Sequence, residues 1–454
     1  MSFLSQLKGA QTLVFGAGVT GKASAKFLEK YGASVQIIDE RSGISGAVQD
    51  FSNLSLRDYE FGIVSPGWRL DNPLITLAKA NGVTIISEID LAWRVKQELN
   101  PNQIWLGLTG TNGKTTTVQM CEAMLQTSGK KAKACGNVGE TAIENVGDLK
   151  NEILVLELSS FQLSWSYEAK FEAVALLNIA EDHIDWHGSF LEYAKAKFRI
   201  AEMSKILIAN LDDETIEIGL KQINIPIIAY TLKTPTKGQI GLVENLIVDR
   251  AFTQDDAEVI FELQDVTPSI PHNVSNAMAA AGLAICAGAK RHDIAVALAN
   301  FKVDNHRLQQ VAETNGIKWV DDSKATNPHA AQAALHSFER CIWIAGGLAK
   351  GADMDSLIKN STARIKSAIL IGTDAHLIAN AISKFAPSIP ITLIEGELKG
   401  IALMREVVDK ALGIAEPGDV VLLAPACASM DQFRDYADRG ECFAASVKGK
   451  ISGK

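Results

Sequence analysis

The sequence has no CxxC pair, no long apolar run and no excess of positive charge. Its six cysteines are scattered along the chain, which favours reduced, buried thiols over a disulfide framework or a zinc site. No apolar run reaches the roughly 18 to 20 residues that a membrane-spanning helix needs. The net charge of -9 does not give the positive field that nucleic-acid binding requires. We therefore expect neither nucleic-acid binding nor membrane insertion.

The first ten residues contain lysine but lack the apolar segment and the small-residue cleavage site of a secretory signal. We therefore expect the protein to stay in the cytoplasm. Its 454 residues, 47% of them hydrophobic and 21% charged, describe a folded globular chain. That length corresponds to about two to four domains, and we expect three.

Short runs of β-branched residues alternate with longer helical patterns along most of the chain. This alternation is typical of parallel sheets covered by helices, so the predicted fold class is α/β. The strands that carry the prediction are 12–15, 34–38, 62–64, 104–108, 153–158, 174–178, 206–209, 319–320, 341–345, 368–371, 391–394 and 420–424.

Two segments divide this pattern into domains. The polar segment 100–103 cannot continue the helix predicted before it. A second boundary near Asp304 follows an alanine-rich helical region that ends in glycine. The predicted domains are a Rossmann-like domain over 1–99, a central P-loop domain with a mainly parallel sheet over 100–303, and a C-terminal Rossmann-like α/β domain over 304–454.

Residues 109–116 read TGTNGKTT and lie between a predicted strand and a predicted helix. Glycines let backbone N–H groups face phosphate oxygens, and the helix N-terminus adds partial positive charge. Lys114 can reach the terminal phosphates, while the hydroxyl of Thr115 can ligate magnesium. Leu108 replaces the first glycine of the general P-loop pattern, but the GKT core is retained. The loop predicts a nucleoside triphosphate site.

Four further motifs follow the loop in order: GNVG at 136–139, ELSSFQ at 157–162, EDHID at 181–185 and HNVSN at 272–276. Together with the shortened P-loop, they resemble the central domain of the Mur ligases and the related folylpolyglutamate synthetases. The resemblance implies ATP and two Mg²⁺ ions. The implied ATP-binding residues are Gly110, Thr111, Asn112, Gly113, Lys114, Thr115, Thr116, Asn273, Asn276, Arg307 and Asp322.

The same resemblance implies metal ligation by Thr115, Glu157, His183 and Lys197 as a carbamate. Lys114, His183 and Lys197 are implied as the catalytic residues. Glu157 and His183 follow predicted strands, and ligands of open α/β sheets bind beyond the carboxyl ends of strands. An unmodified Lys197 ammonium would repel the magnesium, whereas carbamylation by carbon dioxide makes it an anionic oxygen ligand. Lys195 points about 200 degrees around the predicted helix, so the two lysines cannot share a site.

The glycine motif GAGVTG at 16–21 follows a strand, opens a helix and precedes Asp39 at the end of the next strand. This pattern meets the dinucleotide fingerprint, so an NAD-dependent oxidoreductase is a rival hypothesis. The geometry requires only a pyrophosphate, which a uridine nucleotide also carries. The family resemblance implies a UDP-linked substrate held by Val19, Thr20, Asp39, Ser65, Gly67 and Asn137.

Three segments of the last domain read DSKATN at 322–327, GGLAK at 346–350 and PACASMDQF at 425–433. They resemble the D-glutamate-adding branch of the Mur ligases. An acidic amino acid has two carboxylates, so its site needs cations and hydroxyls. The resemblance implies a D-glutamate site made of Lys324, Thr326, Lys350, Ser429 and Tyr436.

The resemblance as a whole implies an ATP-dependent acid–amino-acid ligase. Its substrates would be UDP-N-acetylmuramoyl-L-alanine and D-glutamate, which react through an acyl phosphate in peptidoglycan precursor synthesis, and so serve cell wall biogenesis, cell shape and cell division. We expect a monomer. A noncatalytic nucleotide-binding switch is the third hypothesis, but it would need neither the amino-acid site nor the additional metal ligands.

Overall fold

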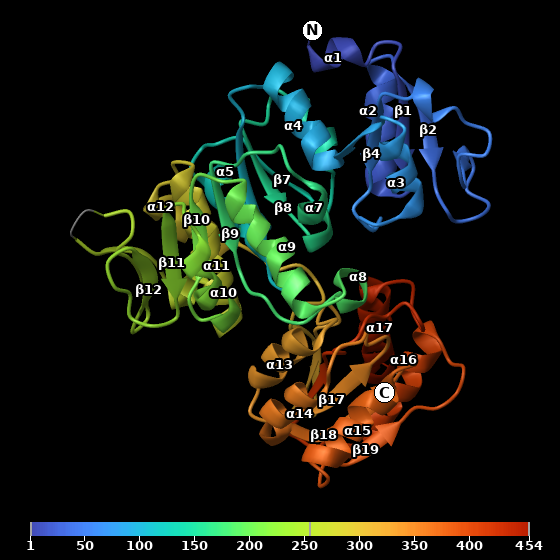
Figure 1. Ribbon diagram of the computed structural model, residues 1–454. Helices are drawn as coiled ribbons and strands as arrows, with labels where there is room; N and C mark the ends of the chain where they lie inside the picture. Colours follow the sequence, from blue (N-terminus) through green and yellow to red (C-terminus); the bar gives the residue numbers. More distant parts are fainter. Residues whose placement is uncertain (1, 254–255, 453–454) are drawn as a thin grey trace. The chain divides into compact units, whose positions relative to one another are not determined.

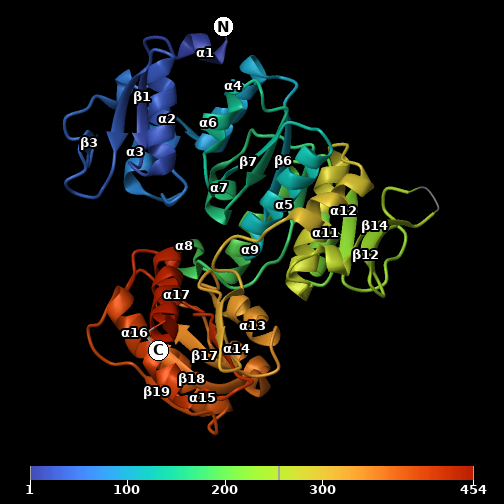
Figure 2. The same ribbon diagram turned by 180° about the vertical axis from the view of Figure 1, so that it is seen from behind.

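A computed structural model describes residues 2–253 and 256–452 (Figures 1 and 2). The described chain forms three mixed α/β layers, each around its own sheet. By their internal contacts, the residues divide into two compact units. The first runs up to Ile179 and includes Leu191–Lys302; the second combines Ala180–Phe190 with the chain from Val303 onward.

The N-terminal sheet has five parallel strands in the order β3-β2-β1-β4-β5. Apolar side chains of β1 and β4 pack with those of α3 in one core cluster. The elements are α1 Phe3–Gln6, β1 Gln11–Phe15, α2 Val19–Lys30, β2 Ser34–Ile38, β3 Ala47–Val48, β4 Phe61–Val64, α3 Pro73–Ala80, β5 Thr84–Ser87 and α4 Glu88–Leu99.

Helix α4 joins this sheet to the middle domain through buried carboxylates. Asp90 accepts hydrogen bonds from three successive backbone N–H groups, those of residues 167–169, at 2.9 to 3.2 Å. Glu88 Oε1 accepts a bond from the Ile143 N–H at 2.7 Å. Burial raises the pKa of both carboxyls, that of Glu88 to about 7. These bonds explain why the first two sheets belong to one compact unit.

The middle sheet has nine strands in the order β14-β13-β12-β11-β10-β9-β6-β8-β7. Strands β6 to β12 pair in parallel, and β12, β13 and β14 pair antiparallel. Figure 2 shows α5, α11 and α12 gathered against this sheet, and their apolar side chains form its largest core cluster.

The strands of the middle domain are β6 Ile104–Thr109, β7 Ala132–Gly136, β8 Ile153–Glu157, β9 Ala173–Leu176, β10 Leu207–Asn210, β11 Ile227–Thr231, β12 Gln239–Val243, β13 Leu246–Asp249 and β14 Glu258–Glu262. The helices along this stretch of chain are α5 Lys114–Thr127, α6 Ala142–Val146, α7 Ser160–Trp165, α8 Ile184–His187, α9 Phe190–Glu202, α10 Glu214–Gly219, α11 Pro271–Cys286 and α12 Arg291–Asn300.

The C-terminal sheet has six strands in the order β15-β16-β20-β17-β18-β19, with only the β15–β16 pair antiparallel. Helices α13, α14 and α15 pack on one face, and α16 and α17 pack on the other. The elements are β15 Gln309–Thr314, β16 Ile317–Asp321, α13 Pro328–His336, β17 Cys341–Gly346, α14 Asp355–Ser361, β18 Ile365–Ile371, α15 Ala375–Phe385, β19 Ile391–Leu393, α16 Gly400–Ile414, β20 Val420–Leu423 and α17 Tyr436–Ser452.

The predicted three-domain α/β architecture is confirmed. The boundaries at 99/100 and 303/304 stay predictions, and the grouping of Ala180–Phe190 with the C-terminal sheet was not anticipated. In the described part of the chain, no helix is both long and apolar enough to cross a membrane. All six cysteines are free.

Candidate active site

The phosphate loop leaves β6 at Thr109 and enters α5 at Lys114. Gly113 has φ 81°, and a Cβ atom there would collide with the side-chain oxygen of Asn276. The backbone conformation and the close approach of Asn276 therefore both require glycine. The Lys114 ammonium donates to the carbonyls of Gly110 and Thr111, each at 2.9 Å, so it lies over the loop that its sequence position predicted.

Asn178, which follows β9, braces the loop from a neighbouring strand. Its Oδ1 accepts from the Asn112 N–H at 2.8 Å, and its Nδ2 donates to the Asn112 carbonyl at 3.0 Å. Its own carbonyl accepts from the Thr111 N–H at 2.9 Å. Sequence reasoning missed this residue; its position at a strand end beside the P-loop strand was the available signal.

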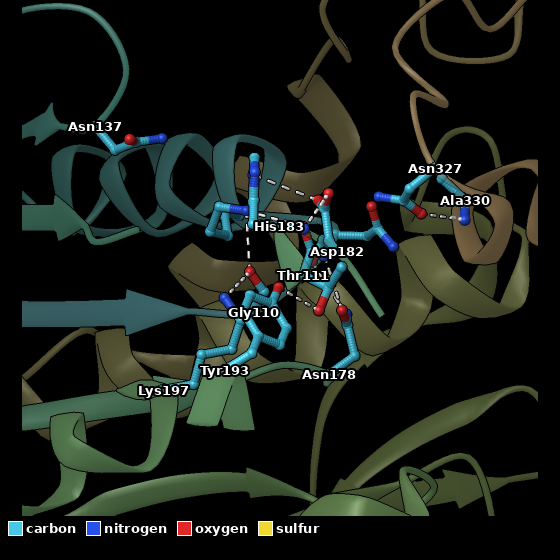
Figure 3. A network of polar contacts seen from close by, with 12 residues as sticks. Gly110, Thr111, Asn137, Asn178, Asp182, His183, Tyr193, Lys197, Asn327 and Ala330 are labelled. Atoms are coloured by element: carbon cyan, nitrogen blue, oxygen red, sulfur yellow. Dashed lines mark hydrogen bonds and ion pairs between the residues drawn. The ribbon is translucent and has the colours of Figure 1, made fainter. Parts of the chain in front are cut away.

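Helix α9 presents a tyrosine and a lysine, one turn apart, to the same loop (Figure 3). Lys197 is 2% exposed, and its Nζ donates to the Gly110 carbonyl at 2.8 Å. The Tyr193 hydroxyl lies 2.8 Å from the Thr111 hydroxyl. By contrast, Lys195 is exposed and pairs with Glu192 at 2.7 Å. The structure therefore separates the two lysines as the helical spacing predicted.

Glu157 ends β8 and is 1% exposed. Asn137 donates from Nδ2 to Glu157 Oε1 at 2.9 Å, and from its backbone N–H to the Glu157 carbonyl at 2.9 Å. Within the described chain, the buried Glu157 Oε2 has no hydrogen-bond partner. The side chain of Asn137, predicted as a substrate contact, thus orients Glu157 and leaves one carboxylate oxygen unused.

The N-terminal glycine loop, residues 16–21, is in contact with the carboxylate of Asp39. Asp39 accepts from the Ala17 N–H at 2.8 Å and pairs with Arg41 at 2.8 Å. The guanidinium of Arg41 holds the pKa of Asp39 well below its usual range. Sequence reasoning missed Arg41, although a basic residue two positions after Asp39 was visible.

The other predicted uridine residues lie around the same edge of the N-terminal sheet. Val19 begins α2 and is 71% exposed, while Ser65 follows β4 and approaches Gly16. The predicted adenine-side Asn273 differs from Asn276, because its Nδ2 donates to the Pro268 carbonyl rather than meeting the P-loop.

Three loops meet at the carboxyl edge of the C-terminal sheet, and they carry four of the five predicted D-glutamate residues; the fifth, Tyr436, begins α17. We name them loop A (322–327, after β16), loop B (346–350, after β17) and loop C (424–433, after β20). Loops B and C pair through reciprocal hydrogen bonds of Leu348 and Ala428, each at 2.9 Å. Loop C is tied to loop A by the bond from the Ala426 N–H to the Ala325 carbonyl at 2.9 Å.

Three of the predicted D-glutamate residues have distinctive surroundings at this edge. Lys324 Nζ lies 3.6 Å from the ring centroid of Tyr436. Lys350 has φ 52°, a conformation that a non-glycine residue adopts only where its surroundings hold it. Ser429 is buried in loop C. Burial also raises the pKa of Asp322 to about 7, and the Leu308 N–H donates to this carboxyl at 3.3 Å.

Comparison with family models assigns all three parts of the chain. Residues 10–87 match the MurD-like N-terminal domain of Mur ligases, residues 108–284 match the Mur ligase middle domain, and residues 306–427 match the glutamate ligase domain of Mur ligases. The UDP-N-acetylmuramoylalanine--D-glutamate ligases of Thermobifida fusca and Streptomyces coelicolor are each 40% identical to this chain, covering 98% of it and 99% of the relative.

The chain belongs to the Mur ligase family. Solved structures agree on the fold. A pseudomurein peptide ligase type C from Methanothermus fervidus aligns with a TM-score of 0.62 at 18% identity, covering 98% of this chain and 100% of that one. The UDP-N-acetylmuramate-alanine ligase MurC of Thermotoga maritima aligns with a TM-score of 0.58 at 17% identity, covering 98% and 100%.

In this Mur ligase, His183 lies in the second compact unit and Glu157 in the first. His183 has φ 53°, and its Nε2 lies 3.6 Å from Asp182 Oδ2. Its shared role with Glu157 on one metal stays a prediction. Across residues 2–253 and 256–452, no group of three or more histidine, cysteine, aspartate or glutamate side chains is arranged to hold a metal.

Proposed function

We propose that this Mur ligase joins D-glutamate to UDP-N-acetylmuramoyl-L-alanine at the expense of ATP, in peptidoglycan precursor synthesis. The observation that carries the proposal is the similarity of 37 to 40% over nearly the whole chain to ligases named for this reaction. The phosphate loop and the cationic loops of the C-terminal sheet supply the two sites that such a reaction needs.

The chemistry proceeds in two steps. A carboxylate oxygen of the L-alanyl group attacks the γ-phosphorus of ATP, the bond to the bridging oxygen breaks, and ADP leaves an acyl phosphate. The amine of D-glutamate then attacks the acyl carbon and loses a proton, and the C–O bond to phosphate breaks. Catalysis of this kind depends mainly on positioning and on neutralising charge.

The middle domain is the proposed ATP site. The backbone of residues 110–113 faces the phosphates at the start of α5, where the helix dipole favours anions. Lys114 moves from the loop carbonyls to the terminal phosphates, and Asn276 braces Gly113. Arg307 and Asp322 of the other unit, together with Thr111, Asn112, Thr116 and Asn273, complete the proposed ATP set.

Two magnesium ions are the proposed cofactor, and when bound they would neutralise the triphosphate. The residues present fit a hard cation, because Glu157 has a buried oxygen that nothing else in the described chain uses. Thr115, His183 and Lys197 are the other proposed ligands.

Lys197 is proposed to react with carbon dioxide. Its neutral amine would attack the carbon of CO₂ and lose one proton, so the product is a carbamate that still carries one N–H. That N–H can keep the observed bond to the Gly110 carbonyl while the new oxygens bind the cation. The burial of Lys197 supports the proposal, since removing an ammonium from water is costly.

The N-terminal domain is the proposed site of the UDP moiety, with Val19, Thr20, Asp39, Ser65 and Gly67 at one sheet edge. Asn137 is assigned to the substrate and, through its bond to Glu157, to the metal. Loops A to C and the start of α17 hold D-glutamate in this proposal, through Lys324, Thr326, Lys350, Ser429 and Tyr436. We further propose that the enzyme acts as a monomer in the cytoplasm, where ATP and UDP-sugars are made.

One assay separates this function from its rivals. Phosphate release from ATP is measured with UDP-N-acetylmuramoyl-L-alanine and a panel of D- and L-amino acids, and product masses are recorded. The expected result is phosphate release with D-glutamate and a product heavier by one glutamyl residue. Hydride transfer with NAD would contradict the proposal. So would ATP hydrolysis at a rate that none of the amino acids changes.

Titration calorimetry tests the N-terminal site separately. The protein should bind UDP and give no heat with NAD. Binding of NAD without a response to uridine nucleotides would revive the oxidoreductase hypothesis for residues 16–21.

A further inference from the structure

Arg439, on the first turns of α17, is a charged side chain that is completely buried in the C-terminal domain. Burial lowers the pKa of its guanidinium to about 10, so the group remains charged at neutral pH. In the described chain, no carboxylate lies within ion-pairing distance of it. The buried Asp321 is occupied by His306 at 2.7 Å and by the Ser323 N–H at 2.9 Å.

The guanidinium is instead held by one oxygen or more from each of loops A, B and C. Nε donates to Ser323 Oγ at 3.0 Å and Nη2 to the Ser323 carbonyl at 3.0 Å. Nη1 donates to the Cys427 carbonyl at 3.1 Å and to the Gly346 carbonyl at 3.4 Å. One planar group therefore fixes the spacing of three loops that are far apart in sequence.

The position of Arg439 is itself fixed from two sides. Ser323 Oγ donates to the Tyr436 carbonyl at 2.7 Å, which ties loop A to the start of α17. Gly440 lies so close to His306 that a Cβ atom would collide with the imidazole ring. The start of helix α17 therefore lies in close contact with His306 and with loop A.

Each anchored oxygen lies close in sequence to a residue of the proposed D-glutamate site. Ser323 directly precedes Lys324. Gly346 and Lys350 are the first and last residues of loop B, and Cys427 precedes Ser429 in loop C. We propose that Arg439 is the positioning residue for the amino-acid site, holding the three loops in the register that brings their cations and hydroxyls to one glutamate. This inference rests on the function proposed above.

The burial of an unpaired cation supports a positioning role over a general contribution to packing. An aliphatic side chain would fill the same volume without the desolvation cost of burying a guanidinium. The guanidinium instead donates to four oxygens drawn from loops A, B and C. Binding sites need their side chains held within about 0.5 Å, which these bonds provide across three separate loops.

The test compares Arg439→Met, Ser323→Ala and Ser446→Ala in the full-length enzyme. Methionine keeps the apolar stem and removes every donor. Ser323→Ala removes one acceptor of Arg439 and the bond to Tyr436. Ser446 is the matched control, because it is buried on the same helix and its hydroxyl has no partner within the described residues. Melting temperatures confirm that each variant is folded.

Two readouts are measured: the KM for each substrate, and hydrogen–deuterium exchange of the backbone amides in the three loops. Arg439→Met should raise the KM for D-glutamate at least tenfold while changing that for the UDP-linked substrate less than threefold, and should speed exchange in loops A, B and C together. Ser323→Ala should give the same pattern at smaller size, and Ser446→Ala neither effect.

Equal changes in the KM of both substrates, or faster exchange confined to α17, would overturn the inference. If Arg439→Met does not fold, Ser323→Ala carries the same two readouts, and an unchanged KM for D-glutamate in that variant is the overturning result. Failure of the proposed function is distinct, because the wild-type enzyme would then form no D-glutamate product while the exchange comparison would still report on the loops.

Discussion

The phosphate loop and the three-loop edge of the C-terminal sheet, the two proposed anion sites, are built in different ways. The phosphate loop is one contiguous segment, and its proposed phosphate contacts depend mainly on backbone N–H groups, one glycine and one lysine. The C-terminal edge is assembled from loops A, B and C, and Arg439 lies beneath all three. Contiguous sites are fixed by local backbone conformation, whereas assembled sites depend on a side chain that touches no ligand.

The largest effect is expected for Lys197, which tests the phosphate loop. Its ammonium donates to the Gly110 carbonyl of that loop. Lys197→Ala should lower kcat by about a hundredfold or more, since it removes a proposed ligand of the cation that neutralises the reacting phosphate. Small carboxylic acids supplied in solution should partly restore turnover by replacing the carbamate. Steady-state kinetics measure both effects.

Lys195→Ala is the matched control and should leave turnover unchanged, since its ammonium pairs with Glu192 at the surface. Full activity of Lys197→Ala in bicarbonate-depleted buffer would contradict the carbamate. So would an unmodified amine at this position in a structure of the active enzyme with two magnesium ions.

Lys350→Ala tests the assembled edge. Loss of a charge-assisted bond to a carboxylate costs about 1.5 to 3 kcal/mol, so the KM for D-glutamate should rise roughly ten- to more than a hundredfold. The KM for ATP should change little. Equal effects on the two substrates would place Lys350 at the nucleotide instead.

Gly113→Ala tests whether the contiguous loop depends on backbone conformation. The positive φ and the close approach of Asn276 should together cost about 1 to 3 kcal/mol, partly as lost ATP affinity of roughly tenfold. Calorimetry with ADP measures the affinity. Gly139→Ala is a useful comparison, because that glycine also has positive φ but no atom lies close to its missing Cβ; similar losses of affinity in both variants would refute the steric argument.

Glu88→Gln has the smallest expected effect on activity, since this carboxyl belongs to neither site. Its pKa is raised from 4.5 to about 7 by burial and by the nearby Glu144, so protonation is favoured in the folded state. The stabilisation is complete below pH 4.5 and is lost as pH rises through 7. Wild-type stability should thus fall by about 1 to 3 kcal/mol relative to Glu88→Gln between pH 5 and pH 8. If the melting temperatures of the two proteins changed equally with pH across that range, the assignment of the raised pKa to Glu88 would be wrong.

Elements with a regular pattern could be predicted from the sequence. The strand Ser34–Ile38 has the predicted bounds, and the phosphate loop lies between β6 and α5 as expected. Strands β12, β13 and β14 were not predicted, because glycine and polar residues interrupt their apolar runs and an antiparallel hairpin needs no helix between strands.

Residues that act through long-range contacts could not be predicted in the same way. Arg439 looks like a surface charge in the sequence RDYADRGE, since nothing local indicates that its helix face is buried. Asn178 and Arg41 have meaning only beside Asn112 and Asp39 in space. The choice of Lys197 over Lys195 was available from helical periodicity, because 193, 197 and 200 share one buried face.

The division of the chain between the two compact units has a consequence for taking the enzyme apart. The polypeptide enters the second unit at Ala180, returns to the first at Leu191 and crosses again at Val303. A protease that cuts only at the last crossing would leave Ala180–Phe190, with α8, on the larger fragment. The smaller fragment would then lack residues that pack in its own unit. We therefore expect the two fragments to copurify, and we expect neither fragment alone to reproduce the structure of its unit in the intact enzyme.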